Sequence, residues 1–328
     1  MALPKLIIDC DTGTDDAVAL TALLLCEKYE VLGITCAHGN QPVESTTDNT
    51  LRLVHFLGRD VPVYKGCACA LTRTLTPGRA CNTLLQRTAA AENGVPVQIH
   101  EKTLPLPPAV RPAAAQHACS FLVDTLRAAQ EPVDIAATAP LTNLAVALRM
   151  APEIARSIGT LYIMGGALQG GNRTPAAEAN FYDDPEAAAI VLQCGCRIVL
   201  GPLEANRAGA TYTLADIAAL EAAGTRTAVF LAQELRAFIH RCHLLFGASE
   251  TECCIHDYAA VAPMIDPQTV RCVRREVCRV DFAGGMADGQ LVVDRRGFGA
   301  RESSVEVVYD MDSARVHALL LALVKRAP

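Results

Sequence analysis

Short apolar runs alternate with helical patterns along most of this 328-residue chain, and the alternation restricts the folds open to it. Runs that are rich in Ile, Val and Leu and end at glycine, proline or polar residues are typical of buried strands, and they cover 6–9, 31–37, 133–138, 160–164 and 197–200. Apolar side chains at helical spacing lie between them, over 15–28, 46–56, 116–129 and 185–194. Strand–helix–strand repetition predicts an α/β fold with an open, mostly parallel β-sheet flanked by helices. Such sheets bind ligands at the carboxyl ends of their strands.

The rest of the chain contains further predicted helices and strands and one stretch that matches neither pattern. Towards the C-terminus we predict helices over 213–242 and 258–265, strands over 270–281, 290–294 and 304–309, and a final amphipathic helix over 312–325. The stretch of about 66–112 is rich in Pro, Thr, Ala and Arg and matches neither pattern, so we expect a long irregular loop near the site. No linker separates two cores, and we therefore expect 1–328 to form a single domain.

Composition excludes several classes of protein. Hydrophobic residues make up 51% of the chain, which is ample for a large core, yet no apolar run reaches the roughly 18 residues that span a bilayer. The net charge of −6 argues against a nucleic-acid partner, which requires a basic surface. An acidic cluster stands where a signal peptide would have its cleavage site. We expect a cytoplasmic protein with no membrane or nucleic-acid partner.

The chain has 14 cysteines, and most lie in apolar segments. Reduced, buried cysteines behave as small apolar side chains. Three close groups suggest a zinc site, namely Cys67-Ala-Cys69, Cys194-Gly-Cys196 and Cys253-Cys254. None has the paired C-x-x-C spacing of a structural zinc site, so we expect reduced cysteines in the core.

Four carboxylates lie within eight residues at the end of the first predicted strand, in Asp9-Cys10-Asp11-Thr12-Gly13-Thr14-Asp15-Asp16. Charges this close repel one another and resist burial, so a cation is needed to compensate them. A helix N-terminus favours an acidic side chain by about 0.3–1 kcal/mol, which accounts for one of these residues. Clustered oxygen ligands suit a hard cation such as Ca²⁺ or Mg²⁺.

Two families place Asp-x-Asp at this point. Haloacid-dehalogenase-like phosphatases have Thr or Val where this chain has Gly13, and they have no counterpart of Asp15-Asp16. The complete pattern Asp-x-Asp-x-Gly-x-Asp-Asp resembles the Ca²⁺-dependent nucleoside hydrolases. Further motifs of that family follow in order over about 5–267: Ile34-Thr35-Cys36-Ala37-His38-Gly39-Asn40, Ala137-Thr138-Ala139-Pro140-Leu141-Thr142-Asn143, Met164-Gly165-Gly166, Gly171-Asn172, Ala177-Glu178-Ala179-Asn180, Asp184-Pro185-Glu186-Ala187 and His256-Asp257.

The resemblance implies a Rossmann-like nucleoside hydrolase fold and an enzyme that cleaves ribonucleosides to ribose and free base with a Ca²⁺-activated water. It also implies a role in nucleoside salvage and a homodimer or homotetramer. Asp11 is then the general base and a Ca²⁺ ligand, together with Asp16, Asp257 and the backbone carbonyl of Thr138. The ribose contacts are expected from Asp15, Asn40, Met164, Asn172, Glu178 and Asn180. His256 is the candidate acid for the leaving base, and Phe238 and Cys242 are expected in the base pocket. His240 on the same predicted helix is a further base-pocket candidate, with a solvent-facing position as the alternative.

The base pocket departs from the family pattern. Ala90 stands where the family's loop commonly has a histidine, and the chain has no tryptophan to stack on a purine. The preferred base therefore stays open. Two other functions also stay open at this point: a haloacid-dehalogenase-like phosphatase and a non-catalytic relative that binds Ca²⁺ or ribose.

Overall fold

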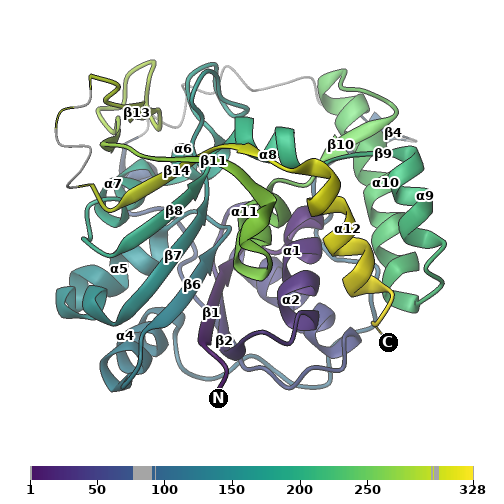
Figure 1. Cartoon of the computed structure of the whole chain (residues 1–328), viewed down its shortest axis with the longest axis horizontal. Coiled ribbons are helices and arrows are strands. Elements are labelled where there is room, and N and C mark those ends of the chain that lie inside the picture. Colours follow the sequence, from purple (N-terminus) through teal and green to yellow (C-terminus); the bar gives the residue numbers. More distant parts are fainter. Residues whose placement is uncertain (1, 77–90, 93, 297, 299–302, 328) are drawn as a thin grey trace.

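An eight-stranded sheet forms the centre of the computed structural model, which describes residues 2–76, 91–92, 94–296, 298 and 303–327 (Figure 1). Neighbouring strands run parallel except β11 and β14, so the predicted mostly parallel α/β sheet is confirmed. The strands, in their order across the sheet, are β11 (Val270–Arg275), β14 (Val305–Met311), β8 (Arg197–Gly201), β7 (Ile158–Met164), β6 (Val133–Ala137), β1 (Lys5–Cys10), β2 (Glu30–Cys36) and β3 (Val63–Lys65).

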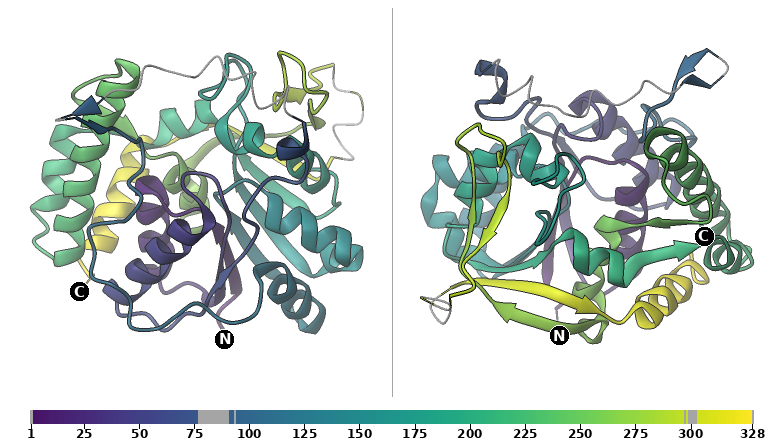
Figure 2. Two further views of the ribbon diagram at one scale, coloured as in Figure 1. Left: turned by 180° about the vertical axis from the view of Figure 1, so that it is seen from behind. Right: turned by 90° about the horizontal axis from the view of Figure 1, so that it is seen from above.

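Helices cover both faces of this sheet (Figures 1 and 2). One core cluster joins the sheet to α1 (Thr14–Leu25), α2 (Val43–Phe56), α10 (Arg226–Phe246), α11 (His256–Ile265) and α12 (Ser313–Val324). A second cluster joins the other face to α4 (Ala118–Ala128), α5 (Thr142–Met150) and α7 (Pro185–Val191). Strand β1 shows why: Leu6 and Ile8 enter the first cluster and Ile7 the second, because successive side chains of a strand point to opposite faces.

Shorter elements complete the fold. The remaining helices are α6 (Ala179–Asp183), α8 (Leu203–Ala210) and α9 (Leu214–Glu221), with 3₁₀ turns at Arg73–Leu75, Pro152–Ser157 and Pro267–Thr269. Three small antiparallel pairs are β4 (Ala91–Glu92) with β5 (Val95–Pro96), β9 (Thr211–Thr213) with β10 (Glu252–Cys254), and β12 (Cys278–Val280) with β13 (Leu291–Val293). None of the helices in the described ranges has the length and apolarity needed to span a bilayer.

Two predicted elements are divided in the structure. The helix expected over 213–242 is α9 followed by α10, because Gly224 adopts a left-handed φ of +76° and Thr225 then caps α10 by accepting the N–H of Ala228. The strand expected over 270–281 is β11 followed by β12. Neither division was predicted. Gly224 followed by Thr225 is a typical helix end and helix start, whereas residues 276 and 277 between β11 and β12 contain no comparable signal.

The irregular stretch of 66–112 is partly packed against the core. Leu104 is buried, and its N–H donates to Oδ1 of Asn49 on α2 at 2.8 Å. Residues 99 and 100 lie beside the site that is described next. Ala90 lies outside the described residues.

Candidate active site

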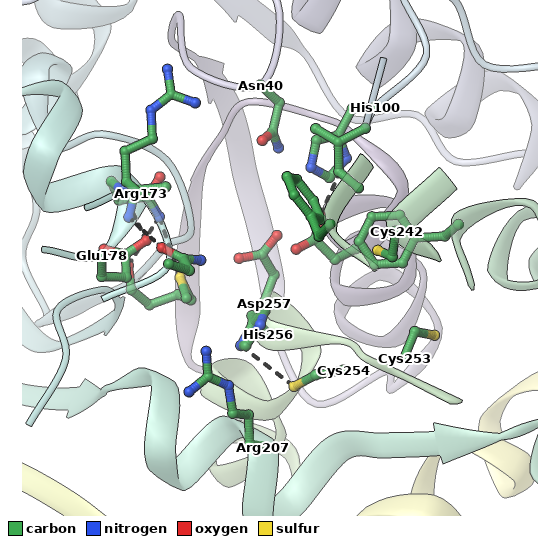
Figure 3. A pocket seen from close by; sticks show the side chains of 18 of the residues that line it. Asn40, His100, Arg173, Glu178, Arg207, Cys242, Cys253, Cys254, His256 and Asp257 are labelled. Atoms are coloured by element: carbon green, nitrogen blue, oxygen red, sulfur yellow. Dashed lines mark hydrogen bonds and ion pairs between the residues drawn. The ribbon is translucent and has the colours of Figure 1, made fainter. Parts of the chain in front are cut away.

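A cavity of about 780 Å³ opens at the carboxyl ends of the central strands (Figure 3). Four connections supply its floor: Asp11 follows β1, Asn40 follows β2, Thr138 follows β6, and Met164 ends β7. We call this part the strand end of the cavity. The opposite part, which we call the helix end, is lined by Arg207 on α8, Phe238, Cys242 and Phe246 on α10, and Cys254 on β10. The volume is in the range of small-molecule sites.

The turn between β1 and α1 places the acidic side chains. A Cβ atom on Gly13 would lie 2.4 Å from Nδ1 of His100, so only glycine fits there. The Gly13 N–H donates to Oδ2 of Asp16 at 3.0 Å, which fixes Asp16 in the first turn of α1. Asp9 belongs to the sheet interior instead, where its Oδ1 accepts from Thr35 at 2.6 Å and from Asn143 at 2.8 Å.

Carboxylates converge on one point of the strand end. One oxygen each from Asp15, Asp16 and Asp257 lies within 4.8 Å of the others. Asp11 accepts the N–H of Asn40 with Oδ2 at 2.6 Å, while its buried Oδ1 and that of Asp15 have no hydrogen-bond partner among the described residues. This donor set fits a hard metal ion, since it offers only oxygens and has unsatisfied ones among them.

Burial raises the pKa of all four carboxyl groups. The pKa rises to about 6 for both Asp15 and Asp16, with desolvation as the largest cause. The pKa of Asp11 and of Asp257 is raised well above its usual value, where desolvation is again the largest cause and the neighbouring aspartates add to it. A bound cation relieves both effects, because it favours the ionised forms.

Amide and carboxylate groups form a connected network beside the aspartates. Asn180 donates from Nδ2 to the carbonyl oxygens of Thr138 at 2.8 Å and Met164 at 3.2 Å. Glu178 caps α6 by accepting the N–H groups of Asn180 and Phe181, and it also accepts the N–H of Gly166 after β7. Burial is the largest cause that raises the pKa of Glu178 to about 7. These contacts hold the strand end in one arrangement.

Asn172 lies nearer the mouth of the cavity, and its Oδ1 accepts the N–H of Ala179 at 3.0 Å. All six residues expected to contact ribose, Asp15, Asn40, Met164, Asn172, Glu178 and Asn180, line this one cavity. The motifs that carry them are up to 165 residues apart in the chain (15 to 180), and the parallel strands bring them together.

His256 also lines the cavity, directly before Asp257 at the start of α11. Its Nδ1 lies 3.4 Å from Sγ of Cys254. Burial, and then the positive charge of Arg207, lower the pKa of His256 to about 3, so the imidazole is neutral near pH 7. A neutral imidazole still carries one N–H group that can donate a hydrogen bond.

Helix α10 supplies the wall of the helix end. Phe238, Cys242 and Phe246 are spaced four residues apart and share one helix face, and all three line the cavity. His240 does not belong to that face: it is exposed, and its Nε2 pairs with Oε1 of Glu92 at 3.2 Å. The structure therefore leaves His240 facing solvent, which is the alternative interpretation of its sequence position, because two residues along a helix turn a side chain away by about 200°.

His100 is a cavity residue that sequence reasoning missed. It is 7% exposed, its Nδ1 accepts the N–H of Thr14 at 3.3 Å, and the same nitrogen lies 3.7 Å from Oδ1 of Asp15. Burial is the main cause that lowers its pKa to about 4. No motif surrounds His100 in the irregular stretch, so only the three-dimensional structure reveals it. Arg207 was missed for the same reason.

Fold and cavity together define an α/β protein with a carboxylate-lined small-molecule site at the carboxyl ends of parallel strands. Comparison with known proteins identifies the family within this class. The family model described as inosine-uridine preferring nucleoside hydrolase matches residues 6–318. The chain belongs to this family, which removes the phosphatase alternative.

Individual relatives, known by sequence or by structure, are also nucleoside hydrolases. The chain is 35% identical over 314 residues to a pyrimidine-specific ribonucleoside hydrolase of Salmonella gallinarum, with 95% of each chain covered. It superposes with a TM-score of 0.83 on a purine-preferring ribonucleoside hydrolase from Gardnerella vaginalis, which is 27% identical with 98% of each chain covered. A plant nucleoside hydrolase gives a TM-score of 0.83 at 26% identity, with 99% of this chain and 100% of that chain covered. These names include both pyrimidine and purine preferences.

Proposed function

We propose that this protein hydrolyses the N-glycosidic bond of ribonucleosides, releasing ribose and the free base, in nucleoside salvage. The observation that carries the proposal is the convergence of Asp11, Asp15, Asp16 and Asp257 beside the polar network of Glu178 and Asn180 in one cavity. Carboxylates and amides of this kind bind a cation and the hydroxyls of a sugar at the same point.

The metal in this proposal is Ca²⁺. Asp11, Asp16, Asp257 and the carbonyl of Thr138 would hold it, and it would supply an acidified water molecule together with fixed positions for the sugar hydroxyls. The Thr138 carbonyl accepts one hydrogen bond from Asn180, which leaves its second lone pair for a ligand. Asp16 is oriented for the same purpose, because Gly13, Asn40 and the Thr138 hydroxyl all donate to its carboxylate.

Asp11 is the proposed general base. The Asn40 N–H holds Oδ2, so the carboxylate cannot rotate freely and Oδ1 keeps its lone pairs for a water proton. The water then attacks the anomeric carbon of ribose. General bases placed in this way contribute about 10²–10⁴-fold to the rate.

The polar network orients ribose. The amide nitrogen of Asn180 is engaged by two carbonyls, so its Oδ1 is the atom left to accept a sugar hydroxyl. Asp15 supplies a second acceptor through its unpartnered Oδ1. Acceptors on the hydroxyls stabilise the positive charge that develops on the sugar ring as the bond to the base breaks.

The base departs towards the helix end. His256 is the proposed hydrogen-bond donor to the leaving base, and Phe238 and Cys242 are the proposed apolar contacts. We propose that the protein forms a homodimer or homotetramer, which sedimentation analysis tests directly.

The experiment is a substrate panel of uridine, cytidine, inosine, adenosine and guanosine, measured as release of reducing sugar with and without a chelator. We expect ribose release from at least one nucleoside, its loss on chelation, and recovery on addition of Ca²⁺. The control substrate is p-nitrophenyl riboside, whose leaving group departs without protonation. Binding of Ca²⁺ and ribose without turnover of any substrate would contradict the proposal and favour the non-catalytic relative.

A further inference from the structure

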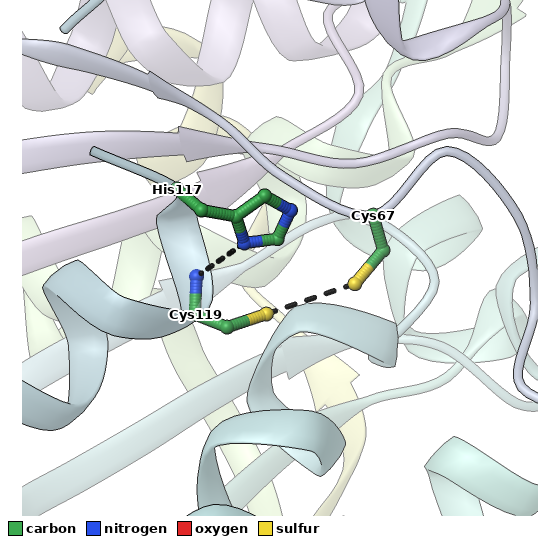
Figure 4. Close-up of side chains that lie close together, drawn as sticks. All are labelled: Cys67, His117 and Cys119. Atoms are coloured by element: carbon green, nitrogen blue, oxygen red, sulfur yellow. Dashed lines mark hydrogen bonds between the residues drawn. The ribbon is translucent and has the colours of Figure 1, made fainter. Parts of the chain in front are cut away.

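A second group of metal-ligating side chains lies away from the cavity. Cys67 follows β3, His117 is the N-cap of α4, and Cys119 is in the first turn of α4 (Figure 4). One ligand atom from each residue lies within 4.8 Å of the other two. The two Sγ atoms are 3.6 Å apart. Cys67 and Cys119 are 52 residues apart in the chain, which is why the cysteine spacing did not predict a site.

The spacing of the sulfur atoms matches a shared metal ion. Tetrahedral Zn²⁺ binds thiolates at about 2.3 Å, which places two ligand sulfurs roughly 3.8 Å apart. A disulfide requires a separation of about 2.05 Å. Two thiols and an imidazole form a soft donor set that selects zinc over calcium. The aspartates of the cavity form the opposite, hard set.

The surrounding contacts hold the two cysteines in place, and the histidine lies beside them. The Cys67 N–H donates to Oδ1 of Asn143 at 2.8 Å, and its carbonyl accepts the N–H of His38 at 3.1 Å. Cys119 is buried, and its thiol lies 3.6 Å from the backbone oxygen of Asn143. Nδ1 of His117 accepts the N–H of Cys119 at 3.2 Å, so its lone pair already faces this turn. His117 is exposed and has room to turn its ring.

We propose that Cys67, His117 and Cys119 bind one soft divalent cation, with Zn²⁺ as the representative ion, and that solvent fills the fourth position. Each thiol gives its proton to solvent as its sulfur binds the metal, so two protons leave for each ion bound. The site joins the two ends of the segment 68–116, and this segment supplies Ile99 and His100 to the cavity. A metal ion that cross-links the two ends of a long loop stabilises the fold, because it reduces the conformational entropy of the unfolded chain.

The test uses purified, reduced full-length protein in excess Ca²⁺, so that the aspartates are occupied. Zn²⁺ is titrated in competition with a chromophoric chelator, and Co²⁺ serves as a second probe because thiolate ligation gives a charge-transfer band. We expect one tight Zn²⁺ per chain, and an affinity reduced roughly tenfold or more in Cys67→Ser and His117→Ala. His117→Ala changes an exposed side chain, so it tests the site even where a cysteine variant fails to fold.

Cys69→Ser is the matched control, because Cys69 is exposed and lies two residues beyond Cys67. It should bind Zn²⁺ as the wild type does. Three results would overturn the proposal: no Zn²⁺ bound in excess Ca²⁺, unchanged affinity in both Cys67→Ser and His117→Ala, or a Co²⁺ complex without a thiolate band. Loss of Zn²⁺ binding in Cys69→Ser alone would overturn the choice of ligands.

Discussion

The two ends of the cavity are built in different ways. At the strand end, Asp11, Asp16 and Glu178 are at most 1% exposed, and each accepts at least one hydrogen bond from backbone or side chain. At the helix end, Phe246 is 46% exposed, and the Arg207 guanidinium makes no hydrogen bond or ion pair with the described residues. The strand end is therefore held by internal hydrogen bonds and leaves buried carboxylate oxygens of Asp11 and Asp15 for a cation. The helix end instead presents exposed side chains, Arg207 and Phe246, that a ligand can contact.

We expect the strand end to determine the rate of bond cleavage and the helix end to determine which base is accepted. The strand end depends on the backbone of the sheet, which is shared with relatives whose names state either a pyrimidine or a purine preference. The helix end depends on which side chains occupy helix faces and loops, and those can change without altering the sheet. Variants at the strand end should abolish turnover, and variants at the helix end should change which base is accepted.

Asp11→Asn should have the largest effect. The amide cannot take a proton and is a weaker metal ligand, so we expect kcat for any accepted nucleoside to fall by about 10³-fold or more. The measurement is steady-state ribose release, with the melting temperature as the control for folding. Activity within tenfold of wild type in a folded variant would mean that Asp11 is not the base.

His256→Ala should have the next largest effect and should depend on the leaving group. Nucleosides lose a hydrogen-bond donor at the base, and we expect kcat to fall about 10²-fold. The p-nitrophenyl riboside should be affected much less, since nitrophenolate leaves without a donor. His240→Ala is the matched control, because this exposed histidine pairs with Glu92 outside the cavity and should leave both rates unchanged. An equal fall in kcat for both substrates would mean that His256 does not donate to the base and instead positions Asp257.

The difference between the two ends also explains which site residues could be predicted from the sequence. Asp15, Asp16 and Asp257 stand in local motifs at helix ends that follow strands or loops, and a parallel sheet brings such ends together, so their convergence was predictable. His100 and Arg207 stand in no motif, and the three-dimensional packing alone brings them to the cavity. The position of His240 stayed open in the sequence, because a helical pattern alone does not state which side chains of α10 face the cavity.

Phe238→Ala should have a smaller and more selective effect. Phe238 is 6% exposed and lines the helix end, where its ring lies 5.5 Å from that of His100. Loss of this contact should lower kcat/KM by about tenfold and change the ranking among the five nucleosides. Competitive inhibition by ribose should stay as in wild type, because ribose occupies the strand end. Weaker ribose inhibition together with an unchanged ranking would contradict the division of the cavity.

Glu234→Gln should have the smallest effect and tests the connection between the two ends. Arg241 on α10 donates to the Thr14 hydroxyl at 3.0 Å and to the Ile99 carbonyl at 3.0 Å, and it lies 3.9 Å from Oε2 of the buried Glu234. Burial raises the pKa of Glu234 from 4.5 to about 7. The folded protein therefore holds this proton more tightly than the unfolded chain does.

The sign of the pH dependence follows from that shift. The protonated form contributes its full stability below about pH 4.5, and the contribution is lost as the pH rises through about 7. Glutamine cannot ionise, so the melting temperature of Glu234→Gln minus that of the wild type should increase by a few degrees between pH 5 and pH 8. The measurement is thermal unfolding at matched ionic strength with Ca²⁺ present. A difference that stays constant with pH would mean that Glu234 is ionised throughout, and that Arg241 joins the two ends as one half of a permanent ion pair.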